Sequence, residues 1–184
     1  KIAAIEGIWH TEKSAPLTLF GWPNEKERRT DYAIQVPKLA SLILAHDLDA
    51  ELKGLDEFPD AHPPVAPVFW GFRVMVGVGM LMLVVSWAGL WMLRRARWRP
   101  DALPRPALQV IRFMGLSGWV AMLAGWYVTE IGRQPFIVFG ELRTAEVVTT
   151  TPAPHVAITL IGYSIEYVLL IVAYGLSMLF SLKT

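Results

Sequence analysis

The chain has 184 residues, 54% of them hydrophobic, and a mean hydropathy of +0.40, so it is more apolar than the about 45–50% typical of soluble domains. Residues 1–67 hold seven Lys and Arg against eleven Asp and Glu, whereas residues 68–184 hold ten against five. This composition predicts a membrane protein with an acidic polar head. The lack of Cys excludes disulfides, iron–sulfur clusters and thiolate metal sites, and no basic stripe with aromatics supports nucleic-acid binding.

The first 67 residues predict a polar region rather than a membrane span. The chain starts at KIAAIE, with neither an initiator Met nor a signal peptide, so we expect a fragment of a longer protein. Residues 21–30 (GWPNEKERRT) are typical of a charged loop opened by turn residues. Residues 32–44 are compatible with a short helix or an extended segment, which Pro37 interrupts.

Three apolar runs predict membrane-spanning helices, at about residues 68–93, 107–131 and 156–182. Each is long enough, because about 20 apolar residues cross the hydrocarbon core of a bilayer. The fold class we expect is therefore an all-α transmembrane helix bundle of three spans, preceded by an extracytoplasmic loop region over residues 1–67.

Basic residues next to the spans predict the orientation in the membrane. Residues 94–105, between the first and second spans, contain five Arg, whereas residues 132–155 contain two Arg and two Glu. The positive-inside tendency places the Arg-rich link in the cytoplasm. Residues 1–67 and 132–155 are then expected together on the outer, periplasmic side.

The first span contains one charged residue, Arg73, two positions before Met75. A guanidinium inside a bilayer costs at least about 2.5 kcal/mol, so we expect an anionic or polar group to receive it. Gly71, Met75 and Gly79 share one helix face, leaving a groove that a planar macrocycle could approach, and methionine is an axial ligand of haem. The alternatives are close helix–helix packing by the glycines and ordinary packing by the methionine.

Two carboxylates in or near the spans are the next candidates. Glu130 lies three residues before Arg133, which predicts either a simple ion pair or a metal-ligating carboxylate beside an arginine that holds a cofactor carboxylate. Glu166 interrupts the third span, where a carboxylate is a candidate for proton transfer or for pairing with a buried cation, or is protonated and hydrogen-bonded to a neighbouring helix. The sequence leaves these alternatives open. All four histidines fall in loops or at a span boundary, so a haem ligand opposite Met75 is expected from elsewhere.

Three separated motifs carry a resemblance to a known family: KIAAIE at residues 1–6, GFRVM at 71–75, and GRQP at 132–135 with Glu130. In this order they resemble subunit I of the cytochrome bd quinol oxidases, along essentially the whole chain and as the C-terminal part of that subunit. The short polar segment and GWPN at residues 21–24 are most similar to the cyanide-insensitive branch.

The resemblance implies roles for six residues. Lys1 and Glu6 match positions implicated in quinol oxidation, at the start of the quinone-binding loop. Met75 matches the methionine that ligates the low-spin haem b, and Arg73 the arginine beside it. Glu130 matches the glutamate of the high-spin haem pair and Arg133 the arginine nearby, whereas Glu166 matches no motif of the family. The implied cofactors are low-spin haem b, high-spin haem b, and haem d or a second high-spin haem b.

The expected function is that of a terminal quinol:oxygen oxidoreductase in the bacterial cytoplasmic (inner) membrane. Ubiquinol or menaquinol would be oxidised at the outer face and O2 reduced to water, which builds a proton motive force without pumping; the fragment alone is expected to be inactive. Implied partners are subunit II, a small single-span subunit and membrane lipid. The alternatives are a cofactor-free structural subunit, with Arg73 and Glu166 paired between helices, and an ion transporter.

Overall fold

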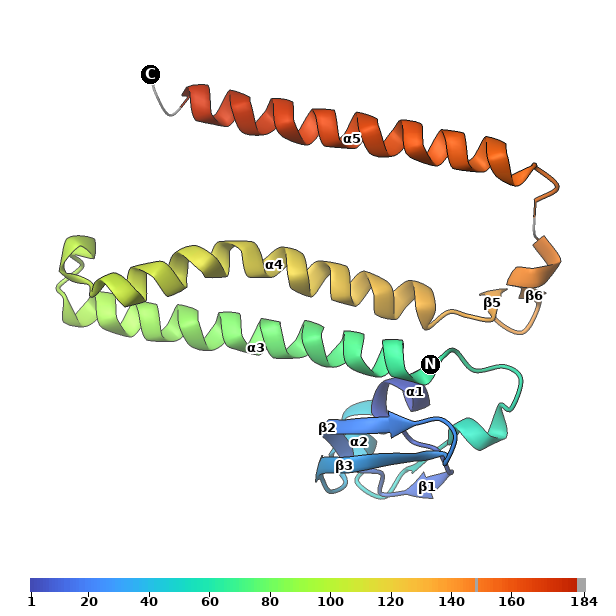
Figure 1. Ribbon diagram of the computed structural model, residues 1–184. Coiled ribbons are helices and arrows are strands. Elements are labelled where there is room, and N and C mark those ends of the chain that lie inside the picture. The colour runs from blue at the N-terminus through green and yellow to red at the C-terminus, as the bar shows by residue number, and fades with distance from the viewer. Residues whose placement is uncertain (148, 182–184) are drawn as a thin grey trace. The chain divides into compact units, whose positions relative to one another are not determined.

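The structure, a computed structural model, describes residues 1–147 and 149–181 (Figure 1). Its contacts divide the chain into two compact units, residues 1–146 and residues 147–184. Three helices are long and apolar enough to cross a membrane: α3 (Val65–Arg95), α4 (Arg105–Ile131) and α5 (Ala153–Ser181). These helices lie where the three spans were predicted and are candidates to cross a membrane, although residue 182, the predicted end of the third, lies outside the described residues. The division at residue 67 into an outer-face region and spans remains a prediction.

The expectation of a strictly all-α protein is wrong, because residues 1–62 fold into a small mixed head. Its helices are α1 (Ile2–Glu6) and α2 (Leu39–Ala45), with a short three-ten helix at Leu55–Glu57. Two antiparallel pairs complete it: β1 (Glu12–Lys13) with β4 (Glu51–Leu52), and β2 (Leu17–Asn24) with β3 (Arg29–Val36). A further pair, β5 (Phe136–Val138) with β6 (Leu142–Arg143), follows α4 and precedes a three-ten helix at Thr144–Val147.

The β2–β3 hairpin occupies residues for which the sequence predicted a loop or left two alternatives open. Residues 21–24, expected in a loop, belong to β2, so the charged turn is confined to residues 25–28. Both alternatives for residues 32–44 occur, since β3 ends before Pro37 and α2 begins after it. Proline has no N–H to donate, which stops the ladder at this point.

The head is tied to the N-terminal turns of α3. Oε1 of Glu25, in the β2–β3 turn, accepts hydrogen bonds from the N–H groups of Val65 (2.8 Å) and Ala66 (3.3 Å). Those N–H groups have no partner within the helix, and a carboxylate there also opposes the positive end of the helix dipole. The Trp70 ring makes edge-to-face contacts with Phe20 and Trp22 of β2 at centroid distances of 5.4 and 5.6 Å.

A small apolar core fills the junction between the head, α3 and the end of α4. Helices α3 and α4 run antiparallel and side by side (Figure 1), joined through a three-ten helix at Pro100–Ala102. The buried residues of the core come from α1 and the segment after it, from α2, from the three-ten helix at Leu55–Glu57, and from the facing ends of α3 and α4. They include Ala3, Ala4, Ile8, Trp9, Ala15, Ala40, Leu55, Val65, Val68 and Val128.

Candidate functional site

Arg73 joins three elements with its guanidinium group. Nη1 donates hydrogen bonds to the carbonyl oxygens of Ile5 on α1 (2.7 Å) and Phe69 on α3 (2.9 Å). Nη2 donates to the carbonyl oxygen of Thr18 on β2 (2.6 Å), and the guanidinium carbon lies 3.2 Å from the Phe69 ring centroid. The side chain is 9% exposed. Backbone carbonyls and an aromatic face thus provide the polar surroundings that an intramembrane arginine needs.

Glu6 is the carboxylate next to this arginine. Its Oε2 accepts a hydrogen bond from the Thr18 N–H at 3.2 Å and lies 4.0 Å from Arg73 Nη2. The side chain is only 5% exposed, and burial raises the pKa of the Glu6 carboxyl above its usual value, while the Thr18 N–H and the charge of Arg73 oppose this rise. Glu6 and Arg73, singled out separately in the sequence, therefore form one buried charged pair.

Met75 faces α4 in the described structure. A Cβ added to Gly125 would lie 2.8 Å from the Met75 Sδ, so the thioether occupies space that the glycine leaves open. One turn earlier, a Cβ on Gly71 would meet Val128 Cγ2 at 2.9 Å, which shows that Gly71 serves close packing of the two helices. A Cβ on Gly79 would meet open space. The predicted helix face of Gly71, Met75 and Gly79 therefore packs against α4 at Gly71 and Met75, whereas no residue that the structure describes lies against it at Gly79.

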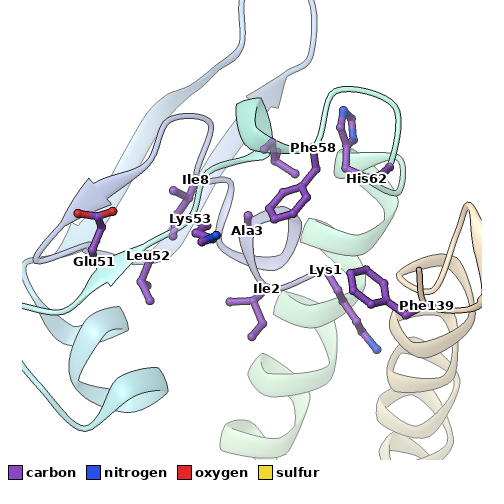
Figure 2. Close-up of a pocket in the computed structure, with 12 residues that line it drawn as sticks. Lys1, Ile2, Ala3, Ile8, Glu51, Leu52, Lys53, Phe58, His62 and Phe139 are labelled. Carbon is purple, nitrogen blue, oxygen red and sulfur yellow. The ribbon is translucent and has the colours of Figure 1, made fainter. Parts of the chain in front are cut away.

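Lys1 contributes to a cavity of about 490 Å³ between the head and the β5–β6 hairpin. Figure 2 shows the side chains around it, with Phe58 from the head and Phe139 from the hairpin near Lys1. Most of its surface is apolar, and the remaining charged side chains in its wall belong to Glu51 and Lys53 of the head, with His62 contributing as well. Glu6 does not line this cavity. Lys1 and Glu6, the two residues expected to act in quinol oxidation, therefore lie in different surroundings.

The GRQP motif forms the next part of the site. Arg133 Nη2 lies 3.7 Å from Glu130 Oε1, and both side chains are about half exposed. The predicted i,i+3 ion pair is therefore present, and at such exposure it contributes little to stability. Arg133 also lines a second cavity of about 260 Å³, which shares Lys1 and Phe139 with the first. The stem of Lys1 packs on Gly132, where an added Cβ would lie 2.9 Å from Lys1 Cε.

Glu166 lies on α5, in the second unit, where its side chain is exposed. Its role stays a prediction. Among residues 1–147 and 149–181, no group of three or more His, Asp and Glu side chains comes together that could hold a metal ion. Within this part of the chain, metal ligation would therefore rest on single residues such as Met75 and Glu130.

Sequence reasoning did not single out several residues of the site. Thr18 binds both Glu6 and Arg73 through its backbone, which any residue type can do, so the sequence held no signal for it. Gly125 could have been noticed as a small residue in an apolar span. Phe139 sits in a short loop, and only the fold places it beside Lys1 (Figure 2).

This fold and site define a class of protein. It is a multi-span helical membrane protein with a buried arginine–glutamate pair and an apolar cavity beside its polar head. The sequence matches the family described as "Cytochrome bd terminal oxidase subunit I" along residues 1–184, and the chain belongs to that family.

Individual relatives agree with the family match. The chain is 31% identical to "Cytochrome bd ubiquinol oxidase subunit 1" of Bacillus subtilis, covering 92% of this chain and 38% of that one. It is 27% identical to "Cytochrome bd-II ubiquinol oxidase subunit 1" of Escherichia coli, with coverages of 94% and 46%. In the solved bd oxidase of Geobacillus thermodenitrificans, 94% of this chain matches 39% of the solved chain with a TM-score of 0.75 and 32% identity.

The chain spans about two-fifths of the length of these relatives. The expectation that it corresponds to the C-terminal part of the subunit remains a prediction.

Proposed function

We propose that the chain is part of a terminal quinol:oxygen oxidoreductase in a bacterial cytoplasmic membrane, and that it supplies walls of the quinol site. The observation that carries the proposal is the mostly apolar cavity of about 490 Å³ with Lys1 in its wall. A concave apolar site with a few polar groups suits a small flat substrate such as the ring of ubiquinol or menaquinol. Membership of the cytochrome bd subunit I family supports the assignment.

Lys1 and Glu6 are proposed to act at different points of quinol oxidation. The reaction removes two electrons and two protons from the quinol. Lys1 lines the cavity, and its ammonium group is proposed to stabilise negative charge that develops on a quinol oxygen as its proton leaves. Glu6 is proposed as a proton acceptor, because its raised pKa brings its proton affinity closer to that of a useful base near neutral pH. Its burial means that the proton would travel through the head to reach it.

The residues of α3 fit the haem that the family implies. Arg73 Nε is buried and has no hydrogen-bond partner among the described residues, so this N–H is free to donate to a carboxylate such as a haem propionate. The Met75 thioether, in the gap left by Gly125, would help to hold a low-spin haem b, while Glu130 and Arg133 would hold a high-spin haem. When bound, the haems supply one-electron redox chemistry and the site of O2 reduction.

The orientation of the chain completes the proposal. Residues 94–105 carry five Arg and would lie in the cytoplasm, so the head and residues 132–155 would share the periplasmic side. Protons from quinol would then leave on that side, and O2 reduction that takes protons from the cytoplasm would build a proton motive force without pumping. Subunit II and a small single-span subunit are the proposed partners.

The proposal is tested on the full-length oxidase complex in native membranes. Addition of a short-chain quinol is expected to drive oxygen consumption, and a reduced-minus-oxidised spectrum is expected to show haem bands. Glu6→Ala is expected to abolish the oxygen consumption while the haem bands remain. A complex that shows haem bands but does not oxidise quinol would contradict the proposed substrate, and a complex without haem would favour a structural subunit.

A further inference from the structure

The tip of the β5–β6 hairpin carries a phenylalanine that reaches the cavity of the head. Phe139 is 80% exposed and precedes Gly140, which has a left-handed φ of 80° as the tight turn requires. Exposure alone would say little, because single apolar residues are common on surfaces. What distinguishes Phe139 is that it lines both the 490 Å³ and the 260 Å³ cavities, beside Lys1 (Figure 2).

Contacts within the segment brace the hairpin on both sides of its tip. The Phe136 ring meets the Phe139 ring edge to face, with centroids 5.6 Å apart, and the Arg143 guanidinium carbon lies 5.5 Å from the Phe136 ring centroid. At its base, Thr144 Oγ1 donates to Gln134 Oε1 at 2.8 Å and the Thr144 N–H donates to the Pro135 carbonyl at 2.9 Å. The Phe139 ring is therefore presented by a braced turn.

We infer that Phe139 is a substrate-binding residue that stacks on the quinol ring, so that the segment after α4 completes the quinol site. The inference deepens the proposed function and rests on it. Phe58, from the head, lines the same cavity, so aromatic side chains reach the cavity from two separate segments of the chain. Aromatic rings prefer offset-stacked or edge-to-face contact with other rings, and a quinol offers such a ring. Lys1 lines the same cavity, so a quinol stacked on Phe139 would lie beside the Lys1 side chain.

The test compares the kinetics of quinol oxidation in the assembled full-length oxidase carrying Phe139→Ala, Phe139→Leu or Phe139→Tyr, with Val138→Ala as the matched control. Val138 is the neighbouring exposed residue of the same hairpin and does not line either cavity. A ring–ring contact corresponds to a change of about two- to twelvefold in affinity. We expect Phe139→Ala and Phe139→Leu to raise KM for a short-chain quinol by that factor with kcat nearly unchanged, and Phe139→Tyr and Val138→Ala to match the wild type.

The outcomes separate the inference from the proposed function. The stacking role is overturned if KM is unchanged in Phe139→Ala, or if Phe139→Leu has the KM of the wild type. In either case the proposed function still stands, provided that the wild type oxidises quinol. An equal rise of KM in Val138→Ala also overturns it, because the effect would then belong to the hairpin as a whole. A wild-type complex that fails to oxidise quinol contradicts the proposed function itself. Haem content of each variant, read from its spectrum, shows whether the complex assembled, and Phe139→Leu carries the test if Phe139→Ala does not assemble.

Discussion

Arg73 Nη2 lies 4.0 Å from Glu6 Oε2 in a pocket where both side chains are less than 10% exposed. This pair links α1, which carries Lys1 at its start, to the turn of α3 that precedes Met75. The segment proposed to contact quinol and the segment proposed to ligate haem are therefore held together by one guanidinium group.

Replacement of Arg73 by Gln is expected to loosen the head from α3. The variant loses the hydrogen bonds to the carbonyls of Ile5 and Thr18 and leaves Glu6 without its cation. Removing one partner of a buried ion pair costs about 3–5 kcal/mol, so the thermal inactivation temperature of the complex should fall clearly. Arg94→Gln, at the exposed far end of α3, is the matched control and should leave that temperature unchanged. Equal inactivation temperatures for both variants would contradict the tethering role.

The stability of the complex is expected to depend on pH through Glu6. Its pKa is raised in the folded state, so between about pH 4.5 and that raised value the folded state binds more protons than the unfolded state. Stability contributed at this site therefore decreases as pH rises through this window. Glu6→Gln removes the titration and should gain thermal stability relative to the wild type as pH rises. A difference between the two proteins that stays constant with pH would contradict the raised pKa.

Gly125→Ala is expected to displace the Met75 sulfur. The new methyl group would lie 2.8 Å from Sδ, closer than van der Waals contact allows, so the thioether must move. If Met75 ligates a low-spin haem, its absorption band in the reduced-minus-oxidised spectrum should shift or weaken. Gly115→Ala is the control on the same helix, because a Cβ there meets open space. The same spectrum should lose this band in Met75→Ala and keep it in Met82→Ala.

Glu130→Gln separates a haem-binding role from a simple ion pair. The pair with Arg133 is half exposed, so its loss should change the free energy of unfolding by only about 0–1 kcal/mol. High-spin haem content, measured from the spectrum and by pyridine haemochrome analysis, should nevertheless fall. A full haem complement in a stable variant would leave Glu130 as an ion-pair partner only.

The sequence predicted the helices better than the head. Apolar runs of at least 25 residues have one structural solution in a bilayer, and α3 and α4 follow them to within three residues at each end. The strands of the head were missed because the charges of residues 25–28 obscured the strand on either side. The charged turn was predicted correctly, but the predicted residues 21–30 extend beyond the observed turn at residues 25–28.

For the candidate site, the sequence could identify chemical types but not their partners. An arginine in a span requires a polar partner, and that was foreseen. That the partners would be carbonyls of Ile5 and Thr18, from segments 68 and 55 residues away, depends on tertiary packing. The same holds for Phe139, which lines one cavity with Lys1, and for Gly132, on which the Lys1 stem packs at the end of α4.

The most direct test of the account is quinol-driven oxygen consumption by the full-length complex, compared between Lys1→Ala and Lys13→Ala. Lys1 lines the cavity, whereas Lys13 lies on the exposed strand β1. The account predicts that Lys1→Ala lowers kcat by about 100-fold, the effect of removing one group that stabilises developing charge, while Lys13→Ala behaves as the wild type. Oxygen consumption that is unchanged in Lys1→Ala, with haem content intact, would contradict it.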